Sequence, residues 1–159
     1  MFGVAAECRS MVDVIFVLDI SGSARYTHPM SRDLASDVIY GLDVRSGAAR
    51  VGIVSYSSRV VGQTYLGDHV GDREAIVNAL RLYPAGRGST DTALALNTVR
   101  TDQLTARRGS RTNVPKVTAI GARTGGAEAA VAPPTKLLGK QLVHPVPPFF
   151  SNLQLKVTL

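Results

Sequence analysis

The sequence is organised around residues 12–23, VDVIFVLDISGS. The stretch 12–18 is almost entirely apolar and rich in β-branched residues, which is typical of a strand buried on both faces of a parallel sheet. Asp19 ends this run, and Ser21 and Ser23 follow it in a segment that cannot continue a strand. The pattern therefore places one acid and two hydroxyls at the carboxyl end of a central strand, where open α/β sheets bind their ligands.

A carboxylate and two hydroxyls at D-x-S-x-S spacing form a set of hard oxygen donors. Such donors suit Mg²⁺ or a similar ion and leave room for coordinated water. The same residues could instead only make a turn and cap the next helix. The buried strand that precedes them favours the metal hypothesis.

Helical and strand patterns alternate in the residues that follow. Apolar side chains recur at helical spacing over 30–42, and two strands are expected at 51–56 and 60–66. Because only three residues separate these strands, they should form an antiparallel hairpin. A second helix is expected to begin after Asp72, its N-cap, and a third to span 93–104 after a Gly-rich loop.

A further strand is expected within 114–120, parallel to 12–19, because helical crossovers separate the two segments. The strand 12–19 should lie between this strand and 51–56. The predicted fold class is therefore α/β, with a Rossmann-like open sheet. Central parallel strands, one antiparallel hairpin strand at an edge and flanking helices make up this sheet.

The composition changes near residue 120. Residues 118–159 hold five of the eight prolines and no aspartate. We expect 121–150 to be mostly irregular, because it lacks helical or strand periodicity. Only 153–159, LQLKVTL, alternates like a strand.

The net charge of +6 is not focused on one segment. Residues 1–117 and 118–159 contribute equally to it, whereas a nucleic-acid face would cluster its charge. The densest basic run, RRGSR at 107–111, is expected to be a solvated loop. His28, His69 and His144 are isolated and are expected at surface or loop positions.

Cys8 is the only cysteine, so no disulfide can form within the chain. It could be an unreactive thiol or pair with a cysteine of another chain. The opening residues are too short and polar for a signal peptide, and no apolar stretch has the length of a membrane span.

The motifs in this order resemble the von Willebrand factor type A domain of matrilins, matrix collagens and integrin I domains. The resemblance covers about residues 11–117 and rests on four segments: VDVIFVLDISGS, ARVGIVSYSS, GSTDTALAL and NVPKV. It implies a Rossmann-like sheet with a metal-ion-dependent adhesion site (MIDAS) at its upper edge.

The resemblance also implies which residues hold the ion. Asp19, Ser21 and Ser23 match the D-x-S-x-S ligands, and Thr90 matches the threonine that the family supplies from a second loop. Thr90 follows a Gly-rich loop and precedes a helix, so its hydroxyl could reach a site beside the first strand. Thr90 could instead cap the helix 93–104, a role equally open to Asp91 or Thr92.

The chain departs from the family pattern after NVPKV. The family continues with an apolar strand that ends in an aspartate, usually within T-D-G, whereas this chain reads VTAIGARTGG and its next acid is Glu128. The resemblance therefore implies a domain cut off partway through its fourth strand, as a splice variant, intron read-through or gene-model error would produce. The expected organisation is an N-terminal extension at 1–10, a partial type A domain at 11–120 and a divergent, Pro-rich tail at 121–159.

Loss of the later strands has two expected consequences. The sheet beside 114–120 should be exposed and prone to aggregation unless a partner covers it. Mg²⁺ or Mn²⁺ should be held weakly, because Asp19 is the only carboxylate placed near the ion, although Asp91 could substitute for the missing acid.

The function implied by the resemblance is a non-enzymatic, extracellular binding module. A bound Mg²⁺ with an open coordination position would accept a carboxylate from a matrix or cell-surface protein, with no role for nucleic acid or a membrane span. A non-functional or purely structural fragment is the main alternative. A Mg²⁺-dependent phosphoryl enzyme is a further one, but it would need more carboxylates on later strands. The sequence holds neither a G-x-S-x-G nucleophile elbow nor a P-loop.

Overall fold

The computed structural model describes residues 10–83, 86, 88–121 and 154–158. Its strands form one mixed five-stranded sheet in the order β3-β2-β1-β4-β5. The strands are β1 (Val12–Asp19), β2 (Ala49–Tyr56), β3 (Val60–Thr64), β4 (Lys116–Ile120) and β5 (Gln154–Thr158). The α-helices are α1 (His28–Gly41), α2 (Arg73–Leu80) and α3 (Thr92–Thr98), with a π-helix η2 (Val99–Gln103) and two 3-10 turns, η1 (Gly22–Ala24) and η3 (Ala106–Arg108).

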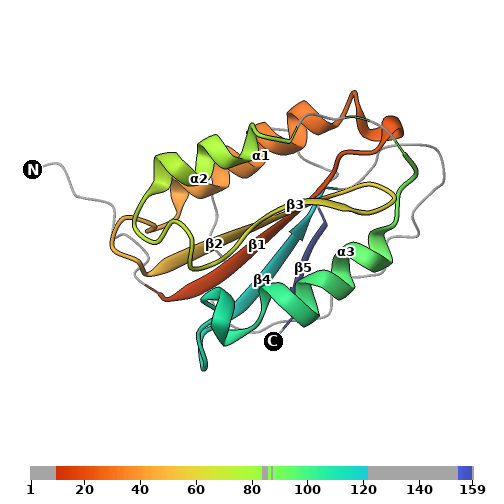
Figure 1. Ribbon diagram of the computed structural model, residues 1–159. Helices are drawn as coiled ribbons and strands as arrows, with labels where there is room; N and C mark the ends of the chain where they lie inside the picture. Colours follow the sequence, from red (N-terminus) through yellow and green to blue (C-terminus); the bar gives the residue numbers. More distant parts are fainter. Residues whose placement is uncertain (1–9, 84–85, 87, 122–153, 159) are drawn as a thin grey trace, which may run out of the picture.

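The strand β1 lies at the centre of the sheet, as predicted. It pairs in parallel with β2 along its whole length, and with β4 from Asp13 opposite Lys116 to Val17 opposite Ile120. Helices α1 and α2 cover one face of the sheet, and α3 covers the other (Figure 1). The apolar character of β1 follows from this arrangement, since side chains on both of its faces are buried.

The alternation of side chains along β1 divides the core into two layers. Val14, Phe16 and Leu18 pack with the buried residues of α1 and α2. Ile15 and Val17 face the other way, toward the side chains of α3. Helices therefore cover both faces of this central strand.

The predicted hairpin and helix starts are confirmed, with shifted boundaries. Strands β2 and β3 pair antiparallel, and β3 ends at Thr64 rather than at residue 66. The side chain of Asp72 accepts a hydrogen bond from the Ala75 amide at 2.9 Å and so caps α2, as expected. Helix α1 begins at His28, two residues earlier than predicted, with Pro29 in its first turn.

The third helix differs from the prediction because it changes type partway. Its α-helical part ends at Thr98 and continues as η2, which brings Gln103 into the core. The side-chain nitrogen Nε2 of Gln103 donates to the Thr64 backbone carbonyl at 3.3 Å. A Cβ atom on Gly52 would lie 2.8 Å from Gln103 Oε1, so this contact depends on a glycine in β2.

The expectation of a bare sheet edge beside β4 is wrong. Strand β5 pairs antiparallel with β4 over its full length, from Lys116 opposite Thr158 to Ile120 opposite Gln154. The strand-like alternation of the last residues is thereby confirmed over 154–158. The predictions for the N-terminal extension, for Cys8 and for 122–150 fall outside the described residues.

The prediction that RRGSR is a solvated loop holds for Arg107 but is wrong for Arg111. The carboxylate of Asp13 is fully buried, and Arg111 Nε donates to it at 2.8 Å. Lys116 Nζ lies 3.2 Å from the other carboxylate oxygen. This Asp13 cluster ties the loop to the end of β1 that is remote from Asp19.

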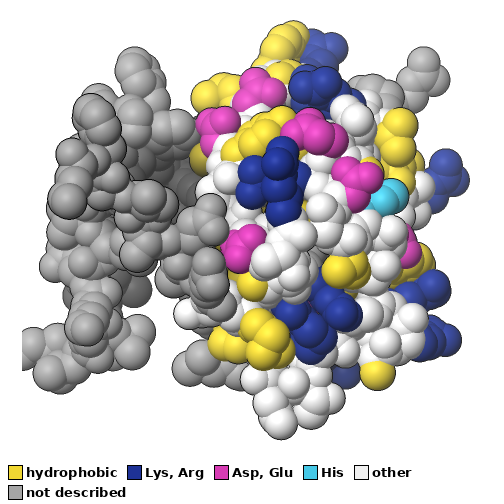
Figure 2. All heavy atoms as spheres, turned by 90° about the vertical axis from the view of Figure 1, so that its left-hand side faces the viewer, with side chains coloured by type: hydrophobic (Ala, Val, Ile, Leu, Met, Phe, Trp, Pro, Cys, Tyr) yellow, Lys and Arg dark blue, Asp and Glu magenta, His cyan; other side chains and the backbone are white. Residues whose placement is uncertain are grey.

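That remote end of the molecule has a surface of mixed charge. Figure 2 shows Lys and Arg side chains interspersed with Asp and Glu on this face, rather than one large basic field. In the part of the chain that the structure describes, no helix is both long and apolar enough to cross a membrane.

Candidate metal centre

The end of β1 positions the acid and the first serine. Asp19 is the last residue of the strand and is half-buried, and its Oδ1 accepts a hydrogen bond from the Ser21 amide at 2.8 Å. This short loop from side chain to backbone is an Asx-turn, which directs the chain out of the strand. Ser21 itself is fully buried, so its hydroxyl has a defined environment.

The three predicted hydroxyls meet at Ser21. Its Oγ lies 3.0 Å from Ser23 Oγ, and Thr90 Oγ1 donates to it at 2.9 Å, although Thr90 is 69 residues away in the sequence. Asp19 is joined to the same residue through the Ser21 amide. The structure thus brings together all four residues that the sequence singled out.

Backbone hydrogen bonds hold the second loop against the first. The Gly86 amide donates to the Ile20 carbonyl at 2.8 Å, and the Gly22 amide donates to the Gly88 carbonyl at 3.2 Å. Gly88 has a φ of +94°, and a Cβ there would lie 2.9 Å from Ser58 Oγ. A glycine at this position is therefore required both by conformation and by space.

The N-cap of α3 is Asp91 and not Thr90. Asp91 Oδ1 accepts from the Leu94 amide at 2.9 Å, and its own amide donates to the Ser57 carbonyl at 2.9 Å. The Thr90 hydroxyl is left to contact Ser21. One carboxylate oxygen of Asp91 thus accepts a hydrogen bond from the helix backbone. That Asp91 takes the place of the missing acid as a metal ligand stays a prediction.

Two neighbours of the cluster, Tyr56 and His28, were not identified from the sequence. Tyr56 ends β2 opposite Asp19 and hydrogen-bonds Thr92 Oγ1 at 3.0 Å. Burial raises the pKa of the Tyr56 phenol, and the negative charge of Asp19 adds to this effect, while the Thr92 hydrogen bond opposes it. The parallel pairing of 12–19 with 51–56 was the signal that could have placed Tyr56 here.

His28 was expected at a surface or loop position, but it is buried in the first turn of α1. Burial lowers the pKa of this imidazole, and nearby Arg32 lowers it further, whereas Asp19 acts in the opposite direction. Its Nε2 atom is buried without a hydrogen-bond partner among the described residues. His28 precedes the predicted helix 30–42, so its place on the buried face with Ala35 and Ile39 was not inferred from the sequence.

The donor set consists of hard oxygen atoms, which suit Mg²⁺ or Mn²⁺ better than metals that prefer thiolate ligands. Mg²⁺ with ligands at about 2.1 Å in octahedral geometry places neighbouring oxygens about 3 Å apart. The Ser21–Ser23 and Ser21–Thr90 oxygen separations, 3.0 and 2.9 Å, match that spacing. Within the described ranges, no three or more His, Cys, Asp or Glu side chains are grouped as a metal site. An ion would therefore rely on Asp19, hydroxyls and water.

The end of β4 supplies no second carboxylate. The Gly121 amide donates to the Val17 carbonyl at 3.3 Å, which continues the parallel register toward the end of β1. The residues that follow read ARTGGA, and the first acid after Lys116 is Glu128. The sequence therefore has no acid at this strand end, while the hydroxyl cluster of Ser21, Ser23 and Thr90 is well formed.

Comparison with known proteins identifies the family. The family model for the von Willebrand factor type A domain matches residues 13–122. Chicken (Gallus gallus) integrin alpha-1 is 32% identical over 114 residues, which cover 72% of this chain and 40% of the relative. Bovine (Bos taurus) matrilin-1 is 33% identical over 115 residues, covering 71% and 21%. Mouse (Mus musculus) collagen alpha-4(VI) chain is 31% identical over 119 residues, covering 73% and 5%.

Solved structures show the same fold. Proximal thread matrix protein 1 of the mussel byssus superimposes with a TM-score of 0.64 at 21% identity, over 77% of this chain and 34% of that protein. A structure of that protein with a zinc-occupied MIDAS motif gives a TM-score of 0.60 at 20% identity, over 73% and 29%. The chain spans less than half the length of the curated relatives described above. The match over most of its length nevertheless shows that the chain belongs to the von Willebrand factor type A family.

Proposed function

We propose that this chain is a non-enzymatic protein-binding module whose binding depends on a divalent cation. The observation that carries the proposal is the convergence of Ser21, Ser23 and Thr90 beside Asp19. Hydroxyls from two loops, held by backbone hydrogen bonds between those loops, form a preorganised set of oxygen donors. The mussel protein of the same fold has a MIDAS motif that holds zinc.

Asp19, Ser21, Ser23 and Thr90 are the proposed ligands, and Mg²⁺ or Mn²⁺ is the proposed ion. A cation bound there would offer an open coordination position to a carboxylate of a partner. The side chains of this chain would fix the direction of that position, because Ser21 is buried and both loops are anchored. Specific recognition of a partner then rests on the rim of the site.

The affinity for the ion should be low because, among the described residues, Asp19 is the only carboxylate hydrogen-bonded to a residue of the hydroxyl cluster. Mg²⁺ is usually held by one or two carboxylates, and each lost negative charge weakens the site. We expect dissociation constants on the order of 10⁻⁴–10⁻³ M, the range of weak Ca²⁺ sites in extracellular modules, which also use oxygen ligands. Asp91 could add a carboxylate only through the oxygen that does not cap α3.

The proposed setting is extracellular, with a matrix or cell-surface protein as the partner. Integrin alpha-1, matrilin-1 and the collagen VI chain support this setting as members of the same family. The partner would present an accessible carboxylate to the bound cation.

Calorimetric titration of Mn²⁺ or Mg²⁺ into the purified chain tests the proposal. Thr90→Ala should reduce the affinity several-fold, since it removes a hydroxyl from the cluster. The matched control is Thr101→Ala, whose hydroxyl is exposed and donates to the Asn97 carbonyl at 2.8 Å rather than to the Ser21 cluster. Equal affinities of the two variants would remove Thr90 from the ligand set.

The alternative of a purely structural fragment gives a different result. If the hydroxyls only hydrogen-bond one another, the wild-type chain should show no saturable heat with either ion. Asp91→Ala separates the roles of the acids. Weakened ion binding with an unchanged loop structure would support Asp91 as the substitute acid, whereas tight stoichiometric binding that survives it would contradict the expected weak site.

A further inference from the structure

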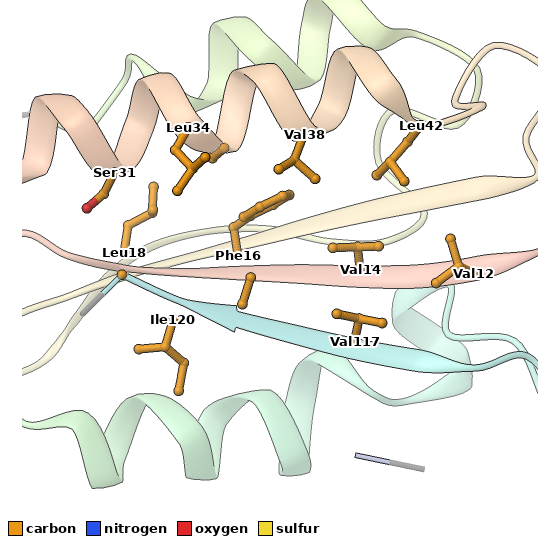
Figure 3. Close-up of a pocket in the computed structure, with 13 residues that line it drawn as sticks. Val12, Val14, Phe16, Leu18, Ser31, Leu34, Val38, Leu42, Val117 and Ile120 are labelled. Carbon is orange, nitrogen blue, oxygen red and sulfur yellow. The ribbon is translucent and has the colours of Figure 1, made fainter. Parts of the chain in front are cut away.

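An apolar groove runs between helix α1 and the strands β1 and β4. It encloses about 210 Å³ and opens at the flank of α1. Leu34 and Val38 of α1 point toward Phe16 and Leu18 of β1, with Val117 of β4 on the far side (Figure 3). We call this feature the α1–β4 groove. Val38 remains 37% exposed, which is high for a valine facing a sheet.

The groove exists because α1 and α2 lie over the β1–β2 half of the sheet. Helix α1 packs on β1 and on α2, and α2 packs on β2. Among the described helices, none lies over β4 on this face (Figure 1). An open apolar face of this kind favours a cover that shields it from water.

The chain itself provides the length for such a cover. Gly121 lines one end of the groove, and Gln154 pairs with Ile120 beside it. A hairpin between β4 and β5 would need only two to five residues, yet 32 residues, 122–153, join these strands. Since β1 spans about 20 Å from Val12 to Leu18 at 3.3 Å per residue, this length of chain can run along the groove and return.

The composition of this joining segment suits the groove. Four apolar residues lie within seven positions, namely Leu137, Leu138, Leu142 and Val143. Lys136 precedes them and Lys140 lies among them, and the segment has a single acid. Helix α1 exposes Asp33 and Asp37, which directly precede the groove residues Leu34 and Val38. The lysines of the segment and the aspartates of α1 have opposite charges. Among the described residues neither aspartate forms an ion pair, so both carboxylates are available to pair with these lysines.

We propose that the segment 122–153 packs into the α1–β4 groove through Leu137–Val143. The divergent C-terminal part of the chain then covers two otherwise exposed surfaces of the domain. Strand β5 covers the edge of β4, and the joining segment covers the adjacent apolar face. This inference stands apart from the metal centre, which lies on other residues.

Disulfide trapping in the full-length chain tests the proposal. In a Cys8→Ser background, Val38→Cys is combined with Leu138→Cys. The control combines Leu138→Cys with Val61→Cys, because Val61 is also exposed but lies on the opposite edge strand β3. Under mild oxidation at low protein concentration, we expect the first pair to form an intramolecular disulfide several-fold faster than the control.

Mass spectrometry of the digested protein identifies the linked peptides. Equal rates for the two pairs would overturn the proposal, because they would show that the segment has no preference for the groove. A disulfide of the first pair that forms only between chains, at a rate that depends on concentration, would also overturn it. The groove would then be occupied by a second copy.

Discussion

Removal of the Arg111 guanidinium should destabilise the domain strongly. In Arg111→Met, the fully buried Asp13 carboxylate loses a hydrogen bond of 2.8 Å from Nε. The substitution also removes hydrogen bonds to three backbone carbonyls, those of Val12, Gly47 and Ala48. Breaking one partner of a buried ion pair costs about 3–5 kcal/mol, because the other charge is left uncompensated.

The cost should fall at the lower end of that range. Lys116 Nζ stays 3.2 Å from Asp13, and the amide of residue 111 still donates to its Oδ2 at 2.9 Å. We therefore expect the unfolding free energy to fall by about 3 kcal/mol. For a urea m-value of about 2 kcal/mol/M, the denaturation midpoint should fall by about 1.5 M.

Arg107→Met is the matched control for this measurement. Its side chain is 71% exposed and pairs at 3.0 Å with Asp102, which also contacts Arg108. An exposed pair contributes about 1 kcal/mol at most. Equal urea midpoints for the two variants would refute the assigned role of Arg111. Adding Asp13→Asn to Arg111→Met should recover part of the loss, since it removes the uncompensated charge.

Three further predictions concern single side chains. Burial lowers the pKa of His28 below 6.5, so the unfolded chain binds the proton more readily and the unfolding free energy should fall as the pH drops below about 6.5. In urea denaturation at several pH values, His28→Gln should remove that slope and His69→Gln should keep it; a slope that survives His28→Gln would contradict the assignment. Gly88→Ala should cost about 1–2 kcal/mol, because φ is +94° there and the added Cβ would meet Ser58, and it should weaken Mn²⁺ binding; unchanged stability and binding would show that the loop relaxes freely. Asp72→Ala should lower the stability by about 1 kcal/mol and speed hydrogen exchange of the Ala75 amide, since it removes the cap of α2; unaltered exchange would mean that the cap contributes little.

Most of the sheet could be predicted because its signals are local. The apolar run of β1, the three residues between β2 and β3 and the helical crossovers together determine strand order and direction. The meeting of Thr90 with Ser21 also followed from this topology. Loops at the carboxyl ends of parallel strands share one edge of the sheet, so residues far apart in sequence become neighbours.

The contacts that could not be predicted join segments with no local signal for each other. Arg111 and Asp13 are 98 residues apart, and the charge run around Arg111 looks the same whether it is solvated or buried. His28 is the first residue of α1 and lies just before the stretch that carries the apolar helical repeat. The pairing of β5 with β4 follows a long Pro-rich stretch, and alternation in β5 alone did not indicate its partner.

The direction of β5 decides where an attached segment leaves the domain. Thr158 lies opposite Lys116, and Lys116 lies opposite Asp13. Strand β5 therefore ends beside the amino-terminal end of β1, at the end of the sheet remote from Asp19. The two ends of β1 are about 23 Å apart at 3.3 Å per residue. A domain tethered to a surface or a larger assembly beyond Thr158 would therefore hold Ser21 and Thr90 on its outward-facing side. Immobilisation through a C-terminal tag should leave that end accessible to a soluble partner.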